Sequence, residues 1–505
     1  MTRSFVLGLD QGTSGSKAVV IDREGRMRGY AYRALARLYP SPDWVEQDPL
    51  AVAQGVAECV SEALGQAGCR PDELAACGIA GQRNTDFAWE VRGGRPIGRA
   101  ITWQDMRTLP LLAELAAWPL AAEAHYRLGY PPAPYMSAFH LAWRLRHDAE
   151  FQAAAHSGNL RLGLSAAWLL AALGQPTAHQ MDTSLVQATG LYDFRAGAYW
   201  TEWLAWLGLS AEFLPRAAPT LADYGVLNLS DPAGRRADVP VLAMIGDQQA
   251  SLFGHNARQP GDAECTHGTA SYVKLFLGER APFTPKANVY YAWHLGKTQT
   301  YCLEADATVT GAALRWMQES AHLFADYREL ETLATGVSDA GGVVFVPAFT
   351  GLNVPYHDPR ARAAIFGLTL GSTRGHLARA FYEAIGLQLR AIVETLAADL
   401  ELPIQQLLVS GGVSASDLAC QLQADLTGLP VSRPTFTETT AWAAALLAGI
   451  GAGLWRVDHL PPLPGGHTAF EPQFSADQRD AAFDRWQKAV ALTQAWGRHT
   501  NQEAS

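Results

Sequence analysis

The stretch FVLGLDQGTSGSKAVVI, residues 5–21, sets a short polar turn between two apolar runs. Residues 5–9 and 18–21 are rich in aliphatic and β-branched side chains, a pattern that predicts two buried strands. The turn between them, residues 10–17, carries two glycines, three hydroxyl side chains and a lysine. Glycine lets a phosphate approach backbone N–H groups, and hydroxyl and ammonium groups add donors and positive charge. The stretch therefore predicts a phosphate-binding turn at the start of an α/β domain.

Two further features bear on this turn. Asp10 could hold Mg²⁺ through water. No helical pattern follows Lys17, and Glu24-Gly25 indicates another hairpin turn, so the stretch is not a Walker loop. Taken alone, an ordinary glycine-rich hairpin explains the same residues equally well, and the rest of the chain has to decide.

The length and composition are typical of a globular protein with two domains. The 505 residues exceed what one core usually covers, and 48% apolar with 17% charged residues is far from the composition of a disordered chain. A net charge of −10 argues against a nucleic-acid partner or an anionic membrane surface. An anionic nucleotide would then be held by local backbone donors and Mg²⁺.

The six cysteines are scattered and show no C-x-x-C spacing. This pattern predicts reduced and mostly buried thiols rather than disulfides or a zinc site. The N-terminus lacks the features of a signal peptide, and no run of about 18 apolar residues suggests a membrane span. We therefore expect a cytoplasmic protein.

The first half of the chain alternates predicted strands and helices. Val52, Val56, Val60 and Leu64 form an amphipathic helical stripe. Strands are expected at residues 74–80, 86–91 and 239–245, and helices at about 109–124, 136–148 and 163–174.

The same alternation restarts beyond about residue 255. A Thr/Gly-rich loop, residues 266–271, precedes a predicted strand at 272–277, and a strand at 407–410 ends in Gly411-Gly412. Helices are expected near 310–320, 374–399, 416–427, 440–453 and 475–498, the last docking through Phe483, Trp486, Val490 and Leu492. We predict two related α/β domains, residues 1–252 and 253–505, that face each other across a nucleotide cleft.

Asp247 is the candidate catalytic residue. It follows a buried apolar strand and precedes a predicted helix, the place where α/β proteins bind ligands. Its carboxylate could take the proton from a hydroxyl that attacks a γ-phosphate. A plain helix cap is the alternative, and the phosphate-type loops at 10–17 and 267–271 favour catalysis.

Other candidates carry weaker local signals. Arg83 and Asn84 follow a strand and offer donors and acceptors for hydroxyls, as a surface loop also would. Trp103 and Tyr135 could wall a substrate site or belong to the core. Neither His267 nor His357 clusters with other ligands, so we assign no metal to them.

Together these motifs resemble the FGGY carbohydrate kinases, and the glycerol kinases most closely among them. The matching segments run in family order through almost the whole chain: 9–17 (LDQGTSGSK), 39–49 (YPSPDWVEQDP), 78–83 (GIAGQR), 100–108 (AITWQDMRT), 245–253 (IGDQQASLF) and 346–368 (VPAFTGLNVPYHDPRARAAIFGL). The resemblance implies two actin-like, ribonuclease H-like domains, ATP with Mg²⁺ in the cleft, and phosphoryl transfer to a polyol or sugar hydroxyl. A homodimer or homotetramer would also suit the family.

The resemblance assigns roles to individual positions. Asp247 matches the general base, and Asp10, with Asp247, matches the acids near magnesium. Substrate-binding positions of glycerol kinases match Arg83, Asn84, Trp103, Tyr135, Asp247, Gln248 and Tyr272. Nucleotide-binding positions match Thr13, Ser14, Lys17, Gly268, Thr269, Gly311, Arg315, Gly411, Gly412 and Asp417.

Several positions depart from the glycerol kinase pattern. Asn84 stands where those enzymes carry Glu, and Tyr272 where they carry Phe. Arg315 replaces a Gln, Asp417 an Asn and His140 a Lys. Because Asn donates as well as accepts, recognition of the acceptor hydroxyls should change at position 84.

Two hypotheses on the substrate follow: glycerol itself, or another polyol or ketose such as xylulose, ribulose or erythritol. An actin-like ATPase that acts on water and a binding module without activity are alternatives from other classes. The polar cluster at 81–85 argues against the first, and the presence of Asp10, Thr13, Asp247 and Thr269 against the second.

Overall fold

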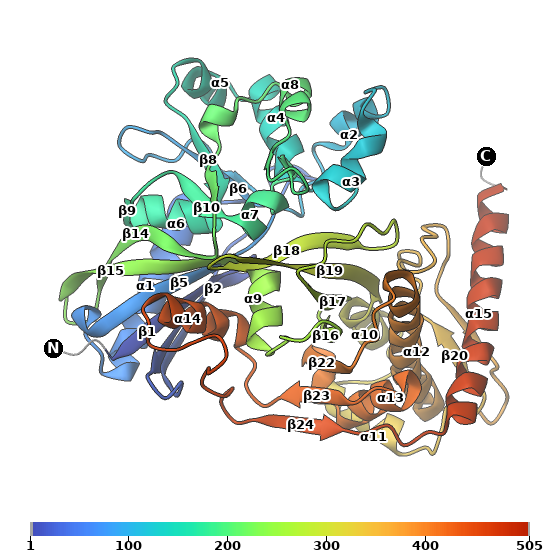
Figure 1. Ribbon diagram of the computed structural model, residues 1–505. Coiled ribbons are helices and arrows are strands. Elements are labelled where there is room, and N and C mark those ends of the chain that lie inside the picture. Colours follow the sequence, from blue (N-terminus) through green and yellow to red (C-terminus); the bar gives the residue numbers. More distant parts are fainter. Residues whose placement is uncertain (1–3, 503–505) are drawn as a thin grey trace.

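Two seven-stranded mixed sheets organise the computed structural model, which describes residues 4–502 (Figure 1). Both sheets share one plan, in which a three-stranded antiparallel meander is followed by two parallel strands. This is the duplicated ribonuclease H-like plan predicted from the sequence. In sheet order, the strands of the first are β3 (Met27–Ala34), β2 (Gly15–Asp22), β1 (Phe5–Gln11), β5 (Leu74–Gly81), β15 (Arg236–Gly246), β14 (Leu221–Ser230) and β9 (Gly174–Pro176).

The second sheet is built from the later half of the chain. Its order is β18 (Asn288–Leu295), β19 (Thr298–Val309), β17 (Ala270–Gly278), β16 (Asp262–His267), β22 (Gln406–Gly411), β23 (Val431–Pro434) and β24 (His467–Phe470). A smaller sheet contains β4 (Glu46–Gln47), β7 (Ala100–Ile101), β6 (Asp86–Trp89) and β8 (Arg161–Leu164). The turn between β2 and β3 confirms the hairpin expected at Glu24-Gly25.

Helix α1 (Pro49–Ala67) shows why the predicted stripe folds as it does. Asp48 caps its N-terminus by accepting from the Leu50 N–H, and Gly68 ends it in the left-handed conformation. All four residues of the predicted stripe are buried. The stripe packs against β2 and β3 of the first sheet.

Helix α14 (Thr439–Gly451) lies on β1 and β5, although it comes from the second half of the chain (Figure 1). A Cβ atom at Gly8 would lie 1.9 Å from the carbonyl oxygen of Ala441, and one at Gly78 would lie 2.0 Å from that of Ala444. Only glycine permits this approach, so backbone packs on backbone. Each large sheet takes its strands from one half of the chain, whereas α14 belongs to the second half and packs on the sheet of the first half.

The remaining helices fall into two groups: some gather at the top of Figure 1, and the others lie around the two large sheets. They are α2 (Leu109–Leu115), α3 (Ala124–Leu128), α4 (Ser137–His147), α5 (Ala149–His156), α6 (Ser165–Leu173), α7 (Thr183–Ala188), α8 (Thr201–Leu207), α9 (Asp247–Gly254), α10 (Gly311–Arg315), α11 (Tyr327–Thr335), α12 (Arg374–Leu400), α13 (Asp417–Thr427) and α15 (Ala476–Gln502).

Two local predictions need correction. The helix expected over 109–124 ends at Leu115, because Pro119 cannot donate a backbone hydrogen bond and restricts the residue before it. The helix predicted near 310–320 is confirmed, with an α-helical part that ends at Arg315 and a π-helix over Trp316–Ser320. On α15, Phe483 and Trp486 dock as expected, but Leu492 faces solvent with 58% of its surface exposed.

All six cysteines are free and buried, as predicted. Within residues 4–502, no helix has the length and apolar character needed to cross a membrane.

Candidate active site

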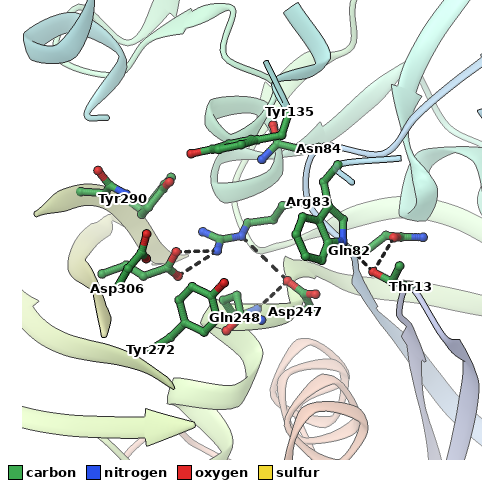
Figure 2. A pocket seen from close by; sticks show the side chains of 13 residues that line it. Thr13, Gln82, Arg83, Asn84, Tyr135, Asp247, Gln248, Tyr272, Tyr290 and Asp306 are labelled. Atoms are coloured by element: carbon green, nitrogen blue, oxygen red, sulfur yellow. Dashed lines mark hydrogen bonds and ion pairs between the residues drawn. The ribbon is translucent and has the colours of Figure 1, made fainter. Parts of the chain in front are cut away.

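All the residues expected to bind the substrate line one cavity of about 250 Å³, which we call the acceptor cavity (Figure 2). They are Arg83, Asn84, Trp103, Tyr135, Asp247, Gln248 and Tyr272. The same cavity is lined by Thr13, which belongs to the turn predicted to bind phosphate, residues 10–17; we call this segment the phosphate turn. Residues that lie far apart in the sequence, from Thr13 to Tyr272, thus line one cavity.

Strand pairing explains how the polar groups converge. β5 and β15 run parallel, with Gly81 opposite Gly246, so the residues that follow both strands share one edge of the sheet. Arg83 and Asn84 follow β5, and Asp247 follows β15 as the first residue of α9. Asn84 has a φ of +53°, a left-handed conformation that Asn tolerates better than most residues.

Arg83 lies between two carboxylates. Its Nη2 atom is 2.9 and 2.8 Å from the two oxygens of Glu304, and its Nε is 3.9 Å from Oδ1 of Asp247. The guanidinium also lies over the Tyr290 ring, 4.7 Å from its centroid. Burial raises the pKa of Asp247 above its ordinary value, although the charge of Arg83 opposes this shift. A carboxylate with a raised pKa and a nearby donor suits proton transfer.

A chain of hydrogen bonds connects the cavity to the phosphate turn. Trp103 Nε1 donates to Thr13 Oγ1 over 2.8 Å, and this hydroxyl donates to Gln82 Oε1 over 3.1 Å. Gln82 in turn donates to the buried side chains of Gln11 and Gln47. These hydrogen bonds hold the side chains of Thr13 and Trp103 in fixed positions relative to each other.

A buried ion pair between Lys274 and Glu264 contacts the side chain of Gln248. Lys274 and Glu264 are only 1% and 0% exposed, and Lys274 Nζ lies 2.5 Å from Glu264 Oε2. Lys274 also donates to Gln248 Oε1 over 3.0 Å. Burial alone would raise the pKa of Glu264, but Lys274 and His255 outweigh burial and lower it. Glu264 therefore stays charged in the core.

A second cavity of about 710 Å³ gathers residues expected to bind the nucleotide. Six of the predicted positions line it: Gly268, Thr269, Gly311, Arg315, Gly412 and Asp417. A Cβ at Gly311 would lie 2.5 Å from the carbonyl oxygen of Gly268, whereas one at Gly412 would meet nothing within 4 Å. At Gly311 the absence of a side chain therefore allows loop packing, and at Gly412 it leaves the backbone open to the cavity.

Four predicted residues line neither cavity. Ser14 is exposed, and its carbonyl accepts from the Tyr32 hydroxyl. Gly411 packs against β16, where a Cβ would lie 2.3 Å from the His267 carbonyl oxygen. The other two residues, Lys17 and Asp10, lie together: Lys17 Nζ is 3.7 Å from Asp10 Oδ2 and 2.7 Å from Glu438 Oε2.

The charges around Asp10 fit a bound cation. Burial raises the pKa of Asp10 to about 7; Lys17 opposes the shift, while Asp247 and Glu438 add to it. In the part of the chain that the structure describes, no group of three or more His, Cys, Asp and Glu could hold a metal ion. Mg²⁺ needs no such group, because one or two carboxylates and the substrate phosphates commonly suffice.

Two of the histidines singled out in the sequence, His267 and His140, have side-chain partners within the protein. The ring nitrogens of His267 contact Ser271 Oγ at 2.7 Å and Gln423 Oε1 at 2.9 Å. His140 Nδ1 lies 2.6 Å from Asp86 Oδ1, and both side chains are buried.

Five residues that complete the acceptor cavity were not named as substrate-binding positions from the sequence, although Gln82 belongs to the polar cluster at 81–85. They are Gln82, Asn288, Tyr290, Glu304 and Asp306. The last four lie on the β18–β19 hairpin, which was not predicted. Its signal was present, since two runs of β-forming residues flank Gly296-Lys297, and Gly296 has a φ of +62°.

Comparison with known proteins gives the family. The N-terminal domain profile of the FGGY family of carbohydrate kinases matches residues 5–254, and the C-terminal profile matches residues 263–452. The chain belongs to the FGGY family of carbohydrate kinases. The predicted ATP-dependent kinase activity toward a polyol or sugar hydroxyl is thereby confirmed, and the two rival functions give way to it.

The similarity extends over nearly the whole sequence of this kinase. It is 37% identical to a glycerol kinase of Symbiobacterium thermophilum over 498 residues, which cover 98% of this chain and 99% of that one. A glycerol kinase of Methylibium petroleiphilum is 39% identical over 500 residues, covering 97% and 100% of the two chains. The similarity therefore includes both halves of the chain.

Solved structures confirm the fold. The crystal structure of Plasmodium falciparum glycerol kinase with ADP superposes with a TM-score of 0.90 at 24% identity, over 97% of this chain and 98% of that one. A structure described as a xyloylose kinase from Brucella ovis gives a TM-score of 0.84 at 26% identity, over 97% and 99%. Glycerol and xylulose kinases therefore share the architecture of this kinase.

Proposed function

We propose that this kinase transfers the γ-phosphoryl group of ATP, with Mg²⁺, to a hydroxyl of a small polyol or open-chain sugar in the acceptor cavity. One observation carries the proposal: Thr13 of the phosphate turn and Asp247 line the same cavity. A hydroxyl beside Asp247 would thus lie next to the turn that holds the transferred phosphate. The nucleotide would occupy the second cavity, around Gly268, Thr269 and Gly412.

The reaction needs one proton acceptor and good positioning. Asp247 takes the proton from the acceptor hydroxyl as its oxygen bonds to the γ-phosphorus. The bond between that phosphorus and the β–γ bridging oxygen breaks, and ADP leaves with the electron pair. Arg83 and Gln248 orient the acceptor beside Asp247.

Asp10 and Asp247 are the residues that would hold Mg²⁺, which supplies positive charge to the phosphate oxygens. The buried free thiols suit a reducing compartment, so we propose that the enzyme is cytoplasmic. From the family resemblance we also propose that it acts as a homodimer or homotetramer.

The test is ADP production by the purified enzyme with ATP, Mg²⁺ and individual polyols or ketoses. Asp247→Asn should lower kcat by about 10²–10⁴-fold, the usual contribution of a general base, and leave ADP binding by calorimetry unchanged. Asp484→Asn, an exposed position on α15, is the matched control. Near-normal turnover of Asp247→Asn, or ADP production that no acceptor stimulates, would refute the proposal.

A further inference from the structure

The acceptor cavity extends beyond the groups that serve the reacting hydroxyl. Asn288 and Tyr290 of β18 and Asp306 of β19 line it, and we call these three residues the distal subsite. Figure 2 shows Tyr290 and Asp306 on one side of the Arg83 guanidinium, with Asp247 and Thr13 on the other. An acceptor with one hydroxyl at Asp247 can therefore extend past Arg83 toward the distal subsite.

The distal subsite holds hydrogen-bonding capacity that the protein does not use. Among residues 4–502, no side chain or backbone group hydrogen-bonds to or ion-pairs with the half-buried carboxylate of Asp306. Burial raises its pKa to about 6, and Glu304 adds to the shift. Nearby, the buried Oδ1 of Asn84 and Nη1 of Arg83 also have no partner in the described structure. Buried polar groups are normally satisfied, so these atoms point to ligand hydroxyls.

The charge of the cavity restricts the class of ligand. Its lining contains three carboxylates, Asp247, Glu304 and Asp306, and one guanidinium, Arg83, which Glu304 already engages. An acidic acceptor would bring another negative charge to this surface, and like charges repel. Carboxylates and amides instead bind neutral hydroxyls well.

We propose that the acceptor is a neutral polyol or open-chain sugar of at least four carbons, whose hydroxyls remote from the attacked end bind Asp306 and Asn288. This inference rests on the proposed kinase function and narrows its substrate. Glycerol, with three carbons, would leave the distal subsite without a hydroxyl to bind.

The test compares kcat/KM for glycerol, erythritol, ribitol, xylitol, xylulose, ribulose and gluconate. In the wild type, a neutral acceptor of four or five carbons should exceed glycerol by about 10–100-fold, the value of a hydrogen bond to a charged group. Asp306→Ala should reduce the ratio of kcat/KM for that acceptor over glycerol by about the same factor, mainly through KM. Asp484→Asn should leave the ratio unchanged.

Two further measurements separate binding from folding. Asp306→Asn keeps the shape and removes a lone charge, so its thermal midpoint at pH 8 should equal or exceed that of the wild type. Calorimetric titration with the preferred acceptor, without ATP, should show weaker binding to this variant.

The outcomes distinguish the two proposals. If glycerol or gluconate leads the panel, or if Asp306→Ala leaves the ratio unchanged, the inference on the substrate is wrong and the kinase function stands. If no acceptor on the panel is phosphorylated although ADP binds, the proposed function fails and the inference fails with it.

Discussion

Replacing Lys274 with methionine should destabilise the kinase and weaken acceptor binding together. The change leaves the carboxylate of Glu264 charged in the core, where both residues of the pair are at most 1% exposed. Loss of one partner of a buried pair costs about 3–5 kcal/mol. Glu264 Oε1 keeps hydrogen bonds from Thr266 at 2.6 Å and Ser410 at 2.9 Å, so we expect about 3 kcal/mol.

The effect on the acceptor comes through Gln248. Lys274 donates to its side-chain oxygen over 3.0 Å, and this charged hydrogen bond orients Gln248 in the acceptor cavity. Such a bond contributes about 1.5–3 kcal/mol. If half of that free energy, about 0.75–1.5 kcal/mol, serves to orient Gln248, KM for the acceptor should rise by about threefold to thirteenfold.

Urea denaturation and steady-state kinetics measure the two effects. The double variant Lys274→Met/Glu264→Gln removes both charges and should recover most of the lost stability, because a neutral replacement of a buried pair is often tolerated. Lys286→Met is the control, since that lysine lies 3.3 Å from Asp399 in a partly exposed pair worth at most about 1 kcal/mol. A loss below about 1 kcal/mol for Lys274→Met, or a double variant whose loss equals the sum of the single losses, would refute the reasoning.

Three other changes test the nucleotide loop, the substrate wall and the core. Gly311→Ala places a Cβ 2.5 Å from the Gly268 carbonyl oxygen, so calorimetry should show ADP binding weaker by about 1–3 kcal/mol; unchanged affinity would contradict this. Trp103→Phe removes the bond to Thr13 and should lower kcat/KM for the acceptor about fivefold, whereas wild-type kinetics would exclude that role. Burial lowers the pKa of His255 from 6.5 to about 4, so the unfolded chain binds its proton first as the pH falls. The free energy of unfolding should therefore decrease by up to about 3 kcal/mol between pH 6.5 and 4, and His255→Gln should flatten this decrease in urea titrations; an unchanged slope would count against it.

Local patterns predicted those parts of the site that lie at strand ends. Asp247 and Arg83 each follow an apolar strand, and this position is visible in the sequence without knowledge of contacts. Asp306 and Glu304 lie within β19 instead, where an acidic residue carries no local sign that its strand faces a cavity. Only the pairing of β19 with β17 and β18 brings them to Arg83.

The fold shows the same division between local and tertiary information. Helix α1 was predictable because its apolar stripe and its caps are local. The position of α14 was not, because the alanines of that helix and the glycines of β1 and β5 that receive it are more than 350 residues apart. Lys274 is a similar case, since a lysine in a strand normally indicates a solvent-facing side chain.

The contact of α14 with Gly8 and Gly78 has a consequence for biosynthesis. The first sheet is complete in the nascent chain once β15 has left the ribosome, but the face of β1 and β5 stays uncovered until residue 451 follows. At about 5–20 residues per second, roughly 10–40 s separate these two events. During that interval the N-terminal half exposes an apolar sheet surface, so this half should reach its native state only after α14 has been synthesised.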